Sequence, residues 1–323
     1  MTLKTIAAPV RNHLDAFDGM FNRAIRSDVL LVDLIARYII RRKGKQVRPI
    51  LVFLSAGACG GVTEASYRGA ALVEILHTAT LIHDDVVDEA DTRRGFPSIN
   101  AVWKNKLAIL MGDYLLAKGL LLALEHDDFG FLTVTSRSVR RMSEGEIHQI
   151  QRIRRLDMDE EAYFRIIGDK TASLIATCCE IGAGSATSDP ALRERLRLYG
   201  EHVGTAFQIR DDLLDYVGRR SITGKPTGLD LSEKKLTLPL IHALAQAPKA
   251  EARAILRLVK EGGKKGALGE VMDFVERRGG IAYAERRAEE FAARAAEALG
   301  PLPDSPARNS LLAFAEFVIR REK

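Results

Sequence analysis

The sequence has few of the residues that mark secreted or metal-stapled proteins. It contains only three cysteines in 323 residues, Cys59, Cys178 and Cys179, and none has the spacing of a zinc or redox motif. The N-terminus lacks the continuous apolar core that a signal peptide requires. We therefore expect reduced thiols in a cytoplasmic protein.

Long apolar runs and aromatic residues are also scarce. The most apolar stretch, 107–124, is interrupted by Asp113 and Lys118, so we expect no transmembrane span. Aromatic residues make up 6% of the chain, and the basic residues behind its net charge of +5 are dispersed. Without a recognisable nucleic-acid-binding module, this composition does not favour nucleic acid as a partner.

What the sequence does contain is helical periodicity. Apolar residues recur at helical spacing through 29–40 and 72–87, with polar residues between them. Strand-like alternation bounded by turn residues is nearly absent. Breaks rich in glycine and proline separate about ten or more such segments by short loops. The pattern predicts an all-α fold, a single large helical bundle spanning residues 1–323 as one domain.

Two aspartate clusters stand on these helices, each of the form Asp-Asp-x-x-Asp. On a helix, aspartates four residues apart lie on one face, where like charges cost roughly 0.2–0.5 kcal/mol per pair. A hard divalent cation offsets this repulsion, and Mg²⁺ in particular takes one or two carboxylates together with substrate phosphates. Two clusters of identical spacing therefore predict metal–phosphate chemistry rather than acidic helix ends. The candidate metal ligands are Asp84, Asp85 and Asp88, and Asp211, Asp212 and Asp215.

Cations and hydrogen-bond donors surround these clusters along the chain. Arginine offers bidentate forks to phosphate, and lysine offers a compact charge. Each such residue alone is more often a surface cation, and a single helical histidine is more often structural. As an ensemble they indicate diphosphate binding. The set is Lys45, Arg48, His77, Arg93, Arg94, Lys170 with Thr171, Lys225 and Lys235.

Five motifs in order give the chain its resemblance to a known family, the trans-type polyprenyl diphosphate synthases. They are the Gly-Lys-x-x-Arg-Pro loop at 44–49, the first aspartate cluster followed by Arg-Arg-Gly, and the Lys-Thr pair at 170–171. The Gln-x-x-Asp-Asp-x-x-Asp segment at 208–215 and the Gly-Lys…Lys-Leu-Thr-Leu-Pro segment at 224–239 follow. One departure is Lys43, where the family usually has glycine, which leaves the exact conformation of that loop open.

The resemblance implies a fold, partners and a role for each candidate residue. It implies helices around a central cavity, a homodimer, and no integral membrane segment, with peripheral membrane contact as one route of product release. The implied substrates are isopentenyl diphosphate and an allylic prenyl diphosphate, with three Mg²⁺ per site. The implied roles are these: Asp84, Asp85 and Asp88, and Asp211, Asp212 and Asp215, hold Mg²⁺; Arg93, Lys170, Lys225 and Lys235 bind the allylic diphosphate; Lys45, Arg48, His77 and Arg94 bind isopentenyl diphosphate; Thr171 and Gln208 face the reacting carbons; and Asp84, Asp88, Lys170, Thr171, Gln208 and Asp211 are catalytic.

Product length is expected from the residues one turn before the first cluster. Ala79 and Thr80 are small where short-chain members of the family carry aromatic rings. We therefore expect the prenyl tail to pass them and run along Leu76, Leu72 and Val73, facing the helix over 107–124. This predicts a heptaprenyl to decaprenyl product, with octaprenyl as the central expectation, for a quinone side chain. If Leu76 closes the pocket, the product is geranylgeranyl or farnesyl diphosphate instead.

Three other readings remain at this point. A class I terpene cyclase would share the first aspartate cluster but usually carries a different second motif and needs no second diphosphate site. A heteromeric synthase would use this chain as its catalytic subunit, since both clusters are intact. A scaffold protein offers no reason for two acidic clusters on apolar helices.

Overall fold

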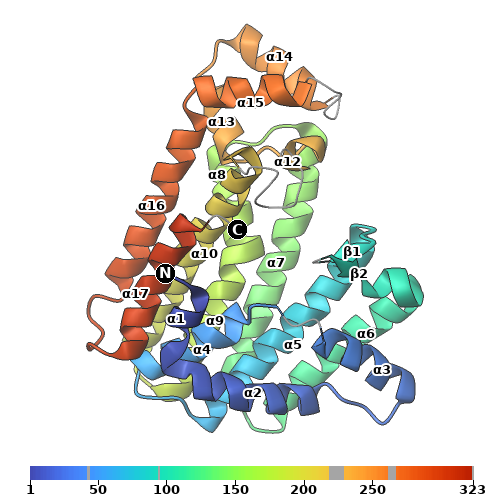
Figure 1. Cartoon of the computed structure of the whole chain (residues 1–323), viewed down its shortest axis with the longest axis vertical. Coiled ribbons are helices and arrows are strands. Elements are labelled where there is room, and N and C mark those ends of the chain that lie inside the picture. Colours follow the sequence, from blue (N-terminus) through green and yellow to red (C-terminus); the bar gives the residue numbers. More distant parts are fainter. Residues whose placement is uncertain (42–43, 94, 218–228, 261–266, 322–323) are drawn as a thin grey trace.

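The computed structural model describes residues 1–41, 44–93, 95–217, 229–260 and 267–321 (Figure 1). Three residues singled out in the sequence, Lys43, Arg94 and Lys225, lie outside these ranges.

The described chain is almost wholly helical, which confirms the predicted all-α fold. A single two-stranded antiparallel hairpin interrupts the helices in the described part of the chain. The first half contains α1 (Leu3–Ile6), η1 (Ala8–Val10), α2 (Arg11–Ala24), α3 (Leu30–Ile40), α4 (Val47–Ala58), α5 (Glu64–Val87), β1 (Thr92–Arg93), β2 (Phe96–Pro97), α6 (Ile99–Leu124) and α7 (Phe129–Arg155). The second half contains α8 (Glu160–Ile167), η2 (Gly168–Ala172), α9 (Ser173–Ala186), α10 (Pro190–Val217), α12 (Leu229–Ser232), α13 (Leu238–Ala245), α14 (Lys249–Lys260), α15 (Ala267–Arg277), α16 (Gly280–Ala298) and α17 (Pro306–Arg320).

Long helices form the body of the molecule and short helices cover its ends. In Figure 1, α14 and α15 lie at one end, whereas α2 and α3 lie at the other. Buried apolar side chains form two clusters, a larger one that includes α4, α5 and α9 and a smaller one around α8, α13 and α15. Phe291 and Ile319 pack against both clusters, so the two cores adjoin.

Helix α5 carries the first aspartate cluster at its C-terminal end. It starts at a reciprocal cap in which the Thr63 hydroxyl accepts from the Ser66 backbone and the Ser66 hydroxyl accepts from the Thr63 backbone. Most of the residues that follow are buried on several sides of the helix, because α4, α6 and α9 all pack against it. An apolar, enclosed helix of this kind places Asp84 at the wall of the cavity while Asp88 forms its C-cap.

Element η2 is a π-helical turn between α8 and α9, a local widening that is frequent at functional sites. Two glycines on neighbouring helices allow the backbones to approach it. A Cβ on Gly145 of α7 would lie 2.9 Å from the Cβ of Asp169, and a Cβ on Gly204 of α10 would lie 2.7 Å from the Cα of Ala172. This turn carries Lys170 and Thr171.

Helix α6 alone among the described helices has the length and composition of a membrane span, although only 33% of its most apolar window is buried. Its exposed apolar residues are Val102, Ile109, Leu110, Leu120, Leu121 and Leu124. The homodimer implied by the resemblance is one expectation that would cover this face.

Candidate active site

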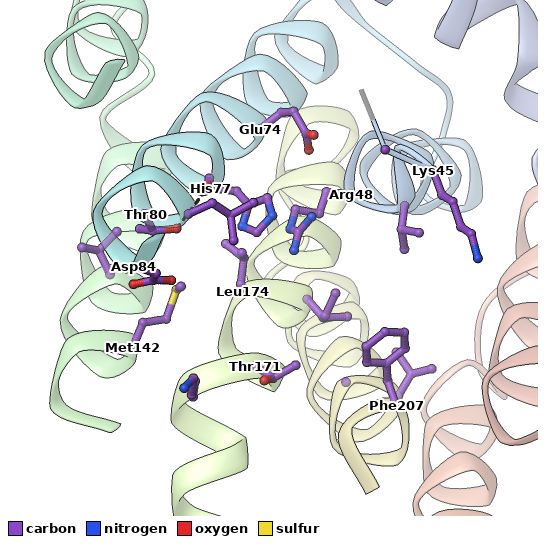
Figure 2. A pocket seen from close by; sticks show the side chains of 18 of the residues that line it. Lys45, Arg48, Glu74, His77, Thr80, Asp84, Met142, Thr171, Leu174 and Phe207 are labelled. Atoms are coloured by element: carbon purple, nitrogen blue, oxygen red, sulfur yellow. Dashed lines mark hydrogen bonds between the residues drawn. The ribbon is translucent and has the colours of Figure 1, made fainter. Parts of the chain in front are cut away.

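A cavity of about 1100 Å³ opens among α4, α5, α7, η2, α9, α10 and α17. In the view of Figure 2, Lys45 lies on one side of the cavity and Asp84 on the other, with Arg48 and His77 between them. Residues from distant parts of the sequence therefore share one enclosed space. The residues of the sequence-based set that line it are Lys45, Arg48, His77, Thr80, Asp84, Lys170 and Thr171.

The three aspartates of the first cluster have different surroundings. Asp84 faces the cavity, where desolvation raises the pKa of its carboxyl above the ordinary value; the charge of Lys170 opposes this rise. Asp85 is 5% exposed and accepts a hydrogen bond from Arg93 Nε at 2.7 Å. Asp88 is exposed at the end of α5. Asp85 and Arg93 thus form an ion pair with each other, whereas Asp84 and Asp88 face outward on the same side of the helix.

In the second cluster, Asp211 forms an ion pair that the sequence did not reveal. Its Oδ1 lies 2.6 Å from Nη2 of Arg321, just beyond the last helix. The Arg321 guanidinium stacks 3.8 Å from the ring centroid of Phe207 and lines the cavity. The two partners are 110 positions apart in sequence, so no local pattern could have found this cation.

Asp212, whose role as a metal ligand stays a prediction, takes part in hydrogen bonds that the sequence did not reveal. It is 6% exposed, and both carboxylate oxygens accept hydrogen bonds within the protein. Tyr163 Oη donates to its Oδ2 at 2.7 Å, and Gln208 Nε2 donates to its Oδ1 at 2.8 Å. Because both oxygens are engaged by side chains, this geometry is that of a structural acceptor rather than of an open metal ligand. Tyr163 belongs to no motif, and nothing in its sequence context marks it.

The side-chain oxygen of Gln208 links these hydrogen bonds to the cavity. Thr171 Oγ1 donates to Gln208 Oε1 at 2.9 Å. Thr171 and Lys170 line both the main cavity and a second one of about 130 Å³, which Gln208, Asp212 and Lys235 also line. The pair on η2 therefore stands between the two spaces.

Two of the candidate cations, Lys170 and Lys235, have carboxylate or amide partners within the protein. Lys170 Nζ lies 2.5 Å from Glu146 Oε2 and donates to Gln149 Oε1 at 3.1 Å, both on α7. Lys235 Nζ lies 2.6 Å from Glu233 Oε2. Ion pairs that are partly exposed contribute little to stability, so these cations can exchange their carboxylates for a diphosphate at small cost.

The carboxylates of the site fit a metal that is shared with substrate. Among the described residues, no three histidine, cysteine, aspartate or glutamate side chains gather closely enough to hold an ion by themselves. Magnesium is usually held in this incomplete way, by one or two carboxylates, waters and substrate phosphate oxygens. Asp84, Asp88 and Asp211 are hard oxygen donors on the exposed faces of their helices and suit this arrangement.

The expected route of the prenyl tail needs a correction. No residue of α6 lines the main cavity, because the face of α5 that bears Leu72 and Leu76 packs tightly on α6 at Gly119. Ala79 is 1% exposed and does not line the cavity, whereas Thr80 does. Beyond Thr80, a small void of about 10 Å³ lies between α5, α7 and α9. Its lining is Val73, Leu76, His77, Thr80, Thr135, Ser138, Val139, Met142 and Leu174.

Comparison with known proteins gives one family over nearly the whole chain. The profile of the polyprenyl synthetase family matches residues 30–275. All-trans-nonaprenyl-diphosphate synthase (geranyl-diphosphate specific) of Rhodobacter capsulatus is 39% identical over 98% of this chain and 97% of its own length. Octaprenyl diphosphate synthase of Escherichia coli is 37% identical, with 100% of both chains covered. The crystal structure of a polyprenyl synthase from Caulobacter crescentus, complexed with calcium and isoprenyl diphosphate, superposes with a TM-score of 0.90 at 32% identity, covering 100% of this chain and 98% of that one.

The helical fold, the cavity and these full-length matches define the chain as a prenyltransferase. It belongs to the polyprenyl synthetase family, whose members are Mg²⁺-dependent trans-prenyltransferases. The resemblance stated from the motifs is confirmed at the level of family and enzyme class.

Proposed function

We propose that this chain condenses isopentenyl diphosphate with farnesyl or geranylgeranyl diphosphate to give a long-chain all-trans polyprenyl diphosphate for a quinone side chain. The observation that carries this proposal is one cavity with two separate polar ends. Asp84, beside the charge of Lys170, stands at one end, and Lys45 stands at the other, with Arg48 and His77 between them. Two ends of this kind suit two diphosphates held with their hydrocarbon parts together.

The residues of the cavity suggest how the reaction proceeds. Lys170 holds the allylic diphosphate, with Asp84 and Asp88 as the residues that would hold metal beside it, while Lys45, Arg48 and His77 hold isopentenyl diphosphate. The allylic C–O bond breaks, and the diphosphate departs with the bonding electron pair. Thr171, whose hydroxyl proton is donated to Gln208, presents its oxygen dipole to the allylic cation, and the terminal alkene carbon of isopentenyl diphosphate forms the new C–C bond. The proton released from the neighbouring carbon goes to the departing diphosphate.

Three Mg²⁺ per active site are part of the proposal. Bound Mg²⁺ neutralises the charge that develops on the departing diphosphate. Asp84 and Asp88 would hold metal from α5, and Asp211 from α10, with the diphosphate supplying further oxygens. Asp215, half-buried one turn after Asp211, is available as an additional or water-mediated contact. Titration calorimetry in the presence of a non-ionisable allylic thiolodiphosphate would count the ions.

A long product, with octaprenyl as the central length, is supported by the small Thr80 at the cavity wall and by the lengths that name the relatives above. The second candidate is a geranylgeranyl or farnesyl diphosphate synthase. It is favoured by one observation, that the void beyond Thr80 is only about 10 Å³ and is closed by Leu76 and Met142. Opening a tail channel there requires these two side chains to change rotamer.

The deciding experiment is to incubate the enzyme with Mg²⁺, labelled isopentenyl diphosphate and farnesyl diphosphate and to size the products. Products of 35 to 50 carbons support the long-chain proposal, since each condensation adds one isoprene unit. If the wild-type enzyme stops at geranylgeranyl diphosphate with ample isopentenyl diphosphate present, the second candidate is correct. An absence of any condensation would refute both.

We further propose a single-domain homodimer in the cytoplasm. The exposed apolar face of α6, which includes Ile109, Leu110 and Leu121, is the surface we assign to the second copy. The adjoining cores support one domain, and the three free thiols suit a reducing compartment. Light scattering that gives a mass near the 35.6 kDa of one chain would contradict the dimer.

A further inference from the structure

A chain of three hydrogen bonds connects the buried interior to the cavity surface. Tyr163 Oη donates to Asp212 Oδ2 at 2.7 Å, Gln208 Nε2 donates to Asp212 Oδ1 at 2.8 Å, and Thr171 Oγ1 donates to Gln208 Oε1 at 2.9 Å. Tyr163 is 3% exposed and Asp212 is 6% exposed, so the inner half of the chain is shielded from solvent. Only Thr171, of the four, lines the main cavity.

The chemistry of these groups fixes the direction of every bond in the chain. An ionised carboxylate can only accept, so Gln208 must turn its NH₂ group toward Asp212. Its carbonyl oxygen then faces Thr171 and can only accept, so the Thr171 hydroxyl must donate its single proton to it. The lone pairs of Thr171 Oγ1 are left to point elsewhere.

We propose that Asp212, anchored by Tyr163, is a positioning residue that sets the hydrogen-bond polarity of Thr171, so that its oxygen offers lone pairs rather than a proton to the cationic carbon. This inference rests on the proposed function, because it concerns the allylic cation formed in that reaction. A hydroxyl proton turned toward the cation would repel it, whereas a fixed oxygen dipole stabilises it without reorganisation.

The substitution Asp212→Asn keeps the shape and reverses the polarity. When Tyr163 donates to the new amide oxygen, as it donates to the carboxylate, the amide NH₂ turns toward Gln208. Gln208 must then rotate to accept from it and presents its own NH₂ to Thr171, whose proton is released toward the cavity. Adding Tyr163→Phe removes the constraint, because the amide of residue 212 can then rotate and offer its oxygen to Gln208 again.

The test compares Asp212→Asn, Tyr163→Phe and the double variant with the wild-type enzyme. The readouts are the affinity for an allylic diphosphate analogue that carries an ammonium group at the position of the cation, and the affinity for an uncharged thiolodiphosphate analogue. We expect Asp212→Asn to weaken the ammonium analogue about tenfold or more, as the loss of a preorganised dipole would, and to leave the thiolodiphosphate analogue within about twofold. The double variant should recover a large part of the lost affinity.

Several outcomes would overturn the inference. If the double variant binds the ammonium analogue no better than Asp212→Asn, the polarity argument is wrong. If Asp212→Asn weakens both analogues equally and also lowers the affinity for Mn²⁺, then Asp212 acts as a metal ligand. Tyr199→Phe is the matched control, because it removes another buried tyrosine hydroxyl, which donates to Leu311 O at 2.7 Å away from this chain.

The inference stays testable if Asp212→Asn does not fold. Tyr163→Phe alone leaves Asp212 as an obligate acceptor, so the ammonium analogue should lose less than about threefold in affinity, as expected for one neutral hydrogen bond that does not change polarity. A loss of tenfold or more would contradict the inference. Failure of the wild-type enzyme to condense the two diphosphates would instead refute the proposed function.

Discussion

Arg321 Nη2 lies 2.6 Å from Asp211 Oδ1, so the end of the last helix supplies a cation to the second aspartate cluster. The Arg321 side chain is only 11% exposed and also donates to the Phe207 carbonyl oxygen at 3.3 Å. A metal ion that binds Asp211 therefore competes with a guanidinium that already neutralises it. The competition has a measurable consequence.

We expect Arg321→Met to tighten the binding of Mn²⁺ to the substrate-free enzyme. An ion pair with a partly exposed partner contributes about 0.2–1 kcal/mol, which corresponds to a change in affinity of roughly 1.4-fold to fivefold. Electron paramagnetic resonance of free Mn²⁺ would measure it. Arg320→Met, at an exposed neighbouring position, is the control. Unchanged or weaker binding in Arg321→Met would show that the pair does not compete with the metal.

Asp84→Asn should abolish turnover and yet stabilise the metal-free protein. Burial, Glu146 and Asp88 raise the pKa of Asp84, and this outweighs the opposing charges of Lys170 and Arg93. A carboxyl whose folded-state pKa is raised costs stability as pH rises from its unfolded value of 3.8 through its folded value, and the full cost persists at neutral pH.

Asparagine is neutral at every pH considered. With EDTA at pH 7.5, the melting temperature of Asp84→Asn should therefore rise by roughly one to a few degrees. The gain should shrink as pH falls toward 4, where the wild-type carboxyl becomes protonated. Asp15→Asn, an exposed position on α2, should show no such rise. Turnover above a few per cent would refute the metal assignment of this residue, whereas a lower melting temperature would show that its charge does not destabilise the metal-free fold.

Two lysines of the cavity should separate the two substrates. Lys45→Ala should chiefly raise KM for isopentenyl diphosphate, while Lys170→Ala should weaken the allylic diphosphate or slow its ionisation. Each lost charge-assisted contact corresponds to roughly 1.5–3 kcal/mol, about ten- to a hundredfold. Steady-state kinetics with each substrate varied in turn will distinguish them. Equal effects of both variants on both substrates would exclude the assignment.

Adjacent residues on α5 should affect product length differently. Thr80 lines the cavity, so Thr80→Tyr should shorten the product sharply while the protein remains folded. Ala79 is 1% exposed, so Ala79→Tyr must displace packed neighbours, at a cost of typically 1–3 kcal/mol or more. Its main effect should be a lower melting temperature. Chromatography of the dephosphorylated products, together with thermal melts, compares the two. The reverse ranking would place the tail on the α6 side of α5.

Helical periodicity and motif spacing were sufficient to predict the fold class and several residues that line the main cavity. Asp84, Lys170 and Thr171 could be found because each belongs to a short motif with the family's spacing. Asp212 was assigned to metal because its motif treats three aspartates alike. Only packing shows that its oxygens accept from Tyr163 and Gln208.

Relationships across the bundle were beyond the reach of the sequence. Gly119 lets α6 pack closely against one face of α5, and the cavity therefore lies on the other face of α5. The Arg321–Asp211 pair depends on how α17 packs beside α10. Local patterns carry no information about either.

The π-helical turn at η2 has a consequence for how this site can change in evolution. A π-turn amounts to one extra residue inserted into an α-helix, and one residue corresponds to about 100° of rotation. Deleting a residue between Gly168 and Ala172 would restore a regular helix, but it would also turn either the Lys170–Thr171 pair or the buried face of α9 out of register. The length of this segment is therefore constrained more tightly than its composition. We expect the enzyme to tolerate substitutions in this segment far better than deletions.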